Sequence, residues 1–123
     1  MLEVYGTNIT VEANSPLAFE GTSVKKGCTA VLESPSTIQL NKCGVYMVAF
    51  DASTAAENTI QMYKDGVVQL QAQSTGTNPS FVTLVQVDHS NTNCCCSSPV
   101  NLTFVPTAAG TLTNVNVAVT KIC

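Results

Sequence analysis

An all-β sandwich is the fold class that the sequence predicts, on three observations. Turn-forming residues recur roughly every eight to twelve residues, and the stretches between them are rich in Val and Thr. No window holds apolar residues at the i, i+3, i+4 and i+7 spacing of a capped helix. The pair Asp65-Gly66 separates two alternating stretches, which is typical of a tight β-hairpin. A chain of 123 residues has room for one core, so we expect a single domain, residues 1–123.

The expected elements are short strands, and Gly, Pro, Asn, Asp or Ser residues lie at most of their boundaries. In order they are 2–6, 8–13, 16–20, 28–33, 37–41, 44–53, 58–64, 67–74, 80–88, 99–105 and 111–122. Successive side chains of a strand point to opposite faces, so clean alternation identifies the inner residues. By this rule the residues expected to point inward near the C-terminus are Val100, Leu102, Phe104, Val115, Val117 and Val119.

Two of the expected strands are apolar on both faces. Residues 45–50 are apolar at every position, and residues 81–87 are apolar at all but two. A single sandwich has one interior, so the outer face of these strands needs a second cover. Another copy of the chain is the simplest cover, and a long edge loop is the alternative. The pattern therefore favours an obligate oligomer.

The composition supports this interpretation. Charged residues make up only 11% of the chain and the mean hydropathy is +0.22. A monomer of this mass would expose roughly 6,300 Å² of surface, which so few charges cover thinly. There is no arginine, and the five lysines are scattered along the sequence (Lys25, Lys26, Lys42, Lys64 and Lys121). Nucleic-acid binding would need a concentrated basic face, so we expect no nucleic-acid partner.

No apolar run approaches the roughly 20 residues that cross a bilayer, so no membrane partner is expected. The first residues, Met-Leu-Glu-Val-Tyr-Gly, have neither the basic region nor the hydrophobic stretch of a signal peptide. We therefore expect synthesis in a cytoplasm without secretion.

Several segments in order resemble the C1q/TNF-like jelly roll, from Ile38 to the C-terminus. Gly44-Val45-Tyr46-Met47-Val48-Ala49-Phe50 resembles the family's G-x-Y-x-[VIF]-x-[FY] strand, and Tyr63-Lys64-Asp65-Gly66-Val67 resembles its hairpin. Residues 69–74, 81–87 and 113–119 resemble the strands that follow. The resemblance covers about two thirds of the chain. It is carried by the order and spacing of motifs that are individually common.

The resemblance implies a jelly-roll β-sandwich of about ten strands that assembles as a homotrimer. Combined with the two strands that are apolar on both faces, it suggests a trimer interface made of Tyr46, Val48, Phe50, Phe81 and Val85. The chain looks most like the short stand-alone members among bacteriophage virion proteins and the surface proteins of Gram-positive bacteria and spores. No repetitive stalk precedes the domain, which favours a trimer docked on a larger surface such as a phage capsid.

Six cysteines occur, at Cys28, Cys43, Cys94, Cys95, Cys96 and Cys123. Adjacent strand residues point to opposite faces, so one chain cannot direct all of 94–96 at one zinc ion, although a threefold axis could collect one sulfur per chain. No C-x-x-C redox motif is present. Disulfides, some of them between subunits, are the favoured interpretation, and free thiols are the alternative. Because cytosolic thiols stay reduced, disulfides would imply an extracellular destination such as a released virion.

No active site is expected. His89 is the only histidine, and its neighbour Asp88 would face the opposite way on a strand. Nothing in the sequence brings two carboxylates together or forms a calcium or phosphate loop. The chain is therefore expected to be no enzyme and to need no metal or cofactor.

Two functions from different classes remain. The first is a non-enzymatic structural virion protein, a trimeric capsid decoration or head-fibre protein bound to the major capsid protein or another virion protein. Its docking arm would lie within Met1–Asn14 and use Leu2, Val4 and Tyr5, unless this segment is simply the first strand. The second is a receptor- or glycan-binding module of a phage, bacterial or spore surface. It would use loops 54–58, 74–80 and 88–98.

Overall fold

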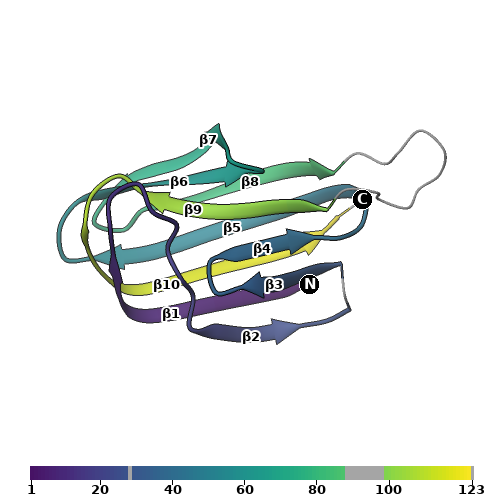
Figure 1. Cartoon of the computed structure of the whole chain (residues 1–123), viewed down its shortest axis with the longest axis horizontal. Helices are drawn as coiled ribbons and strands as arrows, with labels where there is room; N and C mark the ends of the chain where they lie inside the picture. Colours follow the sequence, from purple (N-terminus) through teal and green to yellow (C-terminus); the bar gives the residue numbers. More distant parts are fainter. Residues whose placement is uncertain (28, 88–98, 123) are drawn as a thin grey trace.

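The computed structural model describes residues 1–27, 29–87 and 99–122. Over these residues the chain forms ten strands and no helix, packed face to face as two antiparallel sheets (Figure 1). The first sheet has the order β2-β1-β10-β5-β8, and the second has the order β3-β4-β9-β6-β7. The predicted all-β sandwich of about ten strands is therefore confirmed.

From the third observed strand onward, the predicted ranges agree with the observed ones to within two residues at either end. The strands are β1 (Leu2–Val11), β2 (Gly21–Lys25), β3 (Ala30–Ser34), β4 (Thr37–Leu40), β5 (Gly44–Thr54), β6 (Asn58–Lys64), β7 (Val67–Gly76), β8 (Ser80–Val87), β9 (Val100–Pro106) and β10 (Gly110–Lys121). The residues predicted to point inward from the last two strands are all buried. Alternation identifies these residues correctly because one face of each strand packs against the core.

All four phenylalanines of the chain meet in the core as one cluster. Phe50 of the first sheet stacks on Phe104 of the second, with ring centroids 5.2 Å apart. Phe81 stacks on Phe50 at 5.1 Å and on Phe104 at 6.3 Å, and Phe19 meets Phe104 edge to face at 6.1 Å. Such ring pairs add about 0.5–1.5 kcal/mol each beyond the area that they bury. The cluster joins the two sheets and the connection that precedes β2.

The first two predicted strands are one continuous strand, β1, so the predicted break between residues 6 and 8 is wrong. Leu2 and Val4 are buried, and after Asn8 the buried position shifts parity to Val11. Asn8 has a φ of 50°, a left-handed conformation that Asn tolerates better than most residues. The strand therefore changes its buried parity at Asn8 while it keeps its pairing with β10.

The predicted strand 16–20 is also wrong, because residues 12–20 connect β1 to β2 without strand structure. Leu17 and Phe19 alternate because both are buried against the core, not because they belong to a sheet. Their amides donate to the carbonyl oxygens of Phe104 and Pro35, at 2.9 and 2.7 Å. The strand that was missed, β2, has exposed side chains at four of its five positions and so carries no burial pattern in the sequence.

Glu20 ties the end of this connection to β1. Its carboxylate accepts hydrogen bonds from the hydroxyl of Thr7 at 2.7 Å and from the amide of Thr7 at 2.9 Å. Both bonds favour the charged form, so they lower the pKa of Glu20 below its ordinary value of 4.5. A carboxyl group with a lowered pKa stabilises the folded state above that ordinary value. Its contribution is lost as the pH falls through the lowered pKa.

Replacing Thr7 with valine is expected to raise the pKa of Glu20 toward its ordinary value, because the larger of the two hydrogen-bond contributions is removed. A side-chain NMR titration of Glu20 measures this directly. Thr10→Val, on the same strand and also exposed, serves as the control and should leave the titration unchanged. An unshifted pKa in Thr7→Val would show that the hydroxyl bond is not formed in solution.

The predicted hairpin between β6 and β7 is present and turns at Asp65 and Gly66, with φ values of 51° and 82°. Two consecutive positive φ values are typical of a type I′ turn, and the second position strongly prefers glycine. Gly66→Ala is expected to lower the free energy of unfolding by about 1 kcal/mol. Gly110→Ala is the control, since Gly110 has open space for a Cβ and no left-handed φ. Equal stability of the two variants, measured by denaturant unfolding, would contradict the turn assignment.

Candidate subunit interface

The outer face of the first sheet is apolar where β5, β8 and β10 lie side by side. We name as the apolar outer face the five residues Met47, Ala49, Val82, Leu84 and Ala118. Strand register places Met47 opposite Leu84, and Ala49 between Val82 and Ala118. The side chains of Met47, Val82 and Leu84 are 39%, 65% and 57% exposed. Large apolar side chains thus form a continuous patch in place of isolated exposed residues.

The outer face of the second sheet is polar along its paired strands, and the exposed apolar side chains of this sheet, Val67 and Leu70, lie on its edge strand β7. Its cross-strand pairs are hydrogen bonded through their side chains: Thr59 with Thr75 at 2.6 Å, and Gln61 with Gln73 at 3.1 Å. Gln39 donates to Asn101 in the same way at 3.4 Å. These side chains satisfy one another and water, so this face is stable in solvent without further cover. The contrast between the two faces makes the first sheet the candidate interface.

The structure corrects the residues predicted for the trimer interface. Tyr46, Val48 and Phe50 are at most 2% exposed in the single chain, and Val85 is 3% exposed, so all four belong to its own core. Phe81 is half-buried and also points inward, against Phe50. The two strands chosen from the sequence do carry an apolar outer face. However, the side chains available to a second copy are the alternate ones on each strand.

On β5 the missed residues were detectable from side-chain size, but on β8 they were not, because Thr83 is buried while the larger Leu84 is exposed. When both parities of a strand are apolar, the core is filled by the bulkier set, because close packing excludes voids. In β5 the bulkier set is Tyr46, Val48 and Phe50. The hydroxyl of Tyr46, though buried, donates to the carbonyl oxygen of Lys42 at 2.7 Å, so this tyrosine is compatible with an interior position. Met47 and Ala49 are then left for the outer face.

The docking arm predicted at the N-terminus is not an arm. β1 lies between β2 and β10 in the first sheet, and Leu2 and Val4 are completely buried. The alternative interpretation, a first strand of the sandwich, holds. Only Tyr5 of the three predicted residues is exposed, at 39%, and its ring lies beside Gly21 of β2. Extracting Leu2 and Val4 would open the core, so these two side chains are not available to another protein.

Of the six cysteines, only Cys43 lies within the described residues; Cys28, Cys94, Cys95, Cys96 and Cys123 lie outside them. Cys43 is half-buried between β4 and β5. The described residues on either side of the other cysteines reach the same end of the sandwich. Thr29 bonds to Asn41, Val87 pairs with Gly44, and Ile122 bonds to Val45. The disulfide prediction therefore stays a prediction.

The described residues contain no group of three His, Cys, Asp or Glu side chains that could hold a metal ion. His89 and Asp88 lie outside the described part of the chain. No helix among residues 1–27, 29–87 and 99–122 is long and apolar enough to cross a membrane.

Two of the three loops predicted for glycan binding share one end of the sandwich. Residues 54–58 and 74–80 lie together, since Ser53 donates to Asn78 at 3.1 Å and the amide of Thr54 bonds to Thr77 at 2.9 Å. The third, 88–98, lies outside the described residues. It is flanked by Val87 and Pro99 at the opposite end, where Gly44 pairs with Val87. The structure therefore brings together two of the three predicted loops, and the glycan-site prediction stays a prediction.

Solved structures share the fold of this chain but resemble its sequence only weakly. No family model matches the chain, and no curated protein matches it significantly. Among solved structures, the globular domain of zebrafish complement 1qA superposes with a TM-score of 0.75 at 12% identity, over 99% of this chain and 96% of that one. The vertex protein P5 of PRD1 superposes with a TM-score of 0.67 at 14% identity, over the same shares of the two chains. The chain has the jelly-roll fold of the C1q globular domain and of a viral vertex protein.

Proposed function

We propose that this chain is a non-enzymatic structural protein of a virion surface, a capsid decoration or head-fibre protein. In this proposal it is a homotrimer whose subunits meet through the apolar outer face, and it binds the major capsid protein or another virion protein. Stabilising the particle and displaying a binding face are the two roles that such a trimer can serve.

The observation that carries the proposal is the contrast between the two sheets. On the outer face of the second sheet, polar side chains form hydrogen bonds with one another. The outer face of the first sheet instead exposes Val82 and Leu84 over more than half of their surface. Complete burial of such a side chain stabilises an assembly by about 1.5–3 kcal/mol, so covering both in each subunit is strongly favoured. The fold likeness to a vertex protein supports a virion location.

Two measurements test the proposal. Light scattering is expected to give a native mass near three times the chain mass of 12.9 kDa, both with and without reductant. Loss of the trimer on reduction alone would make cross-subunit disulfides its main support. Sedimentation with virions whose genome encodes the chain is expected to carry the protein into the pellet. A monomer, or a protein that stays in the supernatant, would contradict the corresponding half of the proposal. Recovery from a bacterial cell or spore surface would favour the alternative location.

A further inference from the structure

All five lysines, scattered in the sequence, gather at one end of the sandwich. Lys25, Lys64 and Lys121 are the last residues of β2, β6 and β10. Lys26 follows β2, and its carbonyl oxygen accepts a bond from the amino group of Met1 at 3.0 Å. Lys42 lies in the turn between β4 and β5. We name these five residues and the amino group of Met1 the lysine end.

The strand register confirms that these residues share one end. Leu2 pairs with Lys25, and Lys121 pairs with Tyr46 near the start of β5. Lys64 pairs with Leu102 near the start of β9 in the other sheet, so the charges extend across both layers. All but Lys64 are exposed. Lys64 is half-buried and donates to the carbonyl oxygen of Gln86 at 2.9 Å.

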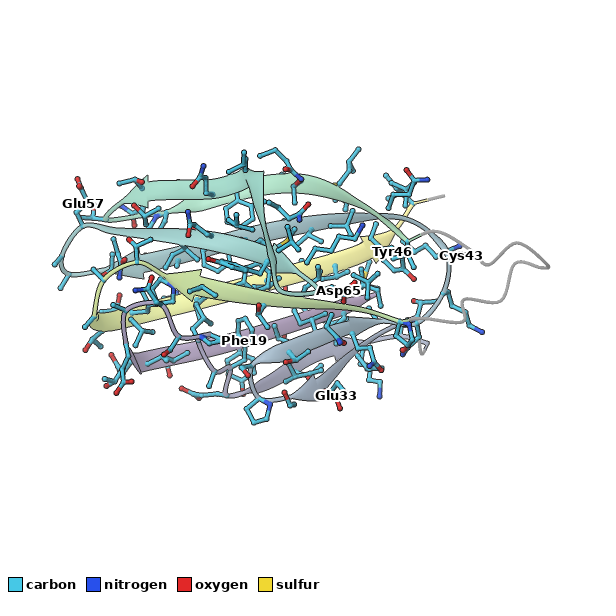
Figure 2. All side chains as sticks on the ribbon, turned by 45° about the horizontal axis from the view of Figure 1, so that its top comes forward. Phe19, Glu33, Cys43, Tyr46, Glu57 and Asp65 are labelled. Carbon is cyan, nitrogen blue, oxygen red and sulfur yellow. The ribbon has the colours of Figure 1, made fainter. Side chains whose placement is uncertain are left out.

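The opposite end has carboxylates and no lysine. Glu12 follows β1 and Glu57 precedes β6; Figure 2 shows Glu57 at the far end of the sandwich from Cys43. At the lysine end the carboxylates of Glu3 and Asp65 are engaged by the hydroxyl of Ser23 and the amide of Asn101. These neutral donors leave both carboxylates charged, but the five lysines and the amino group of Met1 outnumber them at this end, so the described residues separate charge between the two ends although the net charge is −3. A partner near one end responds to the local field more than to the net charge.

We propose that the lysine end is the surface by which the protein docks, and that it docks on an acidic protein surface. This inference rests on the proposed virion function, and it specifies which surface docks. Exposed apolar side chains stand among the charges: Met1 is 51%, Val67 63% and Ile122 50% exposed. A mixture of apolar contacts and surrounding charges is typical of protein interfaces. Phosphate recognition relies strongly on arginine, which the chain lacks, so a nucleic acid fits this surface less well.

The test compares two double variants that make the net charge more negative by the same amount. Lys25→Gln with Lys121→Gln neutralises two exposed members of the lysine end, whereas Thr10→Glu with Thr77→Glu adds two charges at exposed sites of the opposite end. Each is mixed with virions whose genome encodes the chain, at low and at moderate salt. The lysine variant is expected to bind at least about tenfold more weakly than the unchanged protein, and the control equally well, because only the local charge differs.

Two further probes separate the outcomes. If the unchanged protein pellets with virions and the lysine variant pellets equally, the docking end is wrong while the virion function stands. If nothing pellets, the virion function fails, and immobilised poly-L-glutamate still tests the surface. There the unchanged protein should be retained at low salt and the lysine variant should not. Equal retention of the two, or no retention, would overturn the inference. Tighter binding to a 30-base-pair DNA duplex than to poly-L-glutamate would overturn the choice of a protein partner.

Discussion

Replacing Phe50 with alanine is expected to lower the free energy of unfolding by about 3–5 kcal/mol. Phe50 is 2% exposed and stacks on both Phe81 and Phe104, with ring centroids 5.1 and 5.2 Å away. Its removal leaves a cavity between the two sheets and ends both ring contacts. Because the free energy of unfolding of a domain is only about 5–15 kcal/mol, this loss removes a large part of the stability of the fold.

Denaturant unfolding at one protein concentration measures the effect, since assembly also contributes to apparent stability. Leu70→Ala is the control. Leu70 is 75% exposed, so the change should cost less than about 0.5 kcal/mol. If Phe50→Ala unfolds at the same denaturant concentration as Leu70→Ala, the packing of the aromatic cluster described above is wrong.

Replacing both Val82 and Leu84 with glutamate is expected to convert the proposed trimer to monomers. These are the most exposed side chains of the apolar outer face. Against a second copy, the two carboxylates would be buried without partners in every subunit, a cost that a subunit interface cannot absorb. The chain itself should still fold, because both positions face away from its own core.

Light scattering reports the change as a drop from three chain masses to one, and far-ultraviolet circular dichroism should retain its strand signal. The matched control is Gln73→Glu with Thr75→Glu, which places the same two charges on the polar outer face of the second sheet. That control should remain trimeric. A trimeric Val82→Glu, Leu84→Glu protein would show that the subunits meet elsewhere.

The sequence was sufficient for the fold class and for the strands from β3 to the C-terminus, because these elements have regular partners and the expected turn residues. Asp65-Gly66 is the clearest example: its residue types permit few conformations other than a tight turn. In the first 25 residues the same rules gave wrong boundaries. Asn8 changes the buried parity without ending a strand, and Leu17 and Phe19 alternate within a connection.

Alternation predicted the candidate interface only to the level of strands, and side-chain size adds the facing of β5 alone. β5 and β8 are apolar at nearly every position, so alternation alone cannot say which set of side chains faces the core. That choice depends on how side chains from the opposite sheet pack, as Phe104 does against Phe50. The lysine end could not be predicted at all. Its members come from five separate stretches of sequence, and only the strand register brings them together.

The pairing of β1 with β10 also determines when this protein can fold. Residues 2–11 are the first strand to be synthesised, and their inner neighbour in the sheet, residues 110–121, is the last. Until β10 emerges, the apolar side chains of Leu2 and Val4 have no completed sheet to enter. Pairing across so long a loop is slow, and it leaves a growing chain exposed to aggregation. The first sheet is therefore completed only after residues 110–121 have been synthesised, however early the β6–β7 hairpin forms.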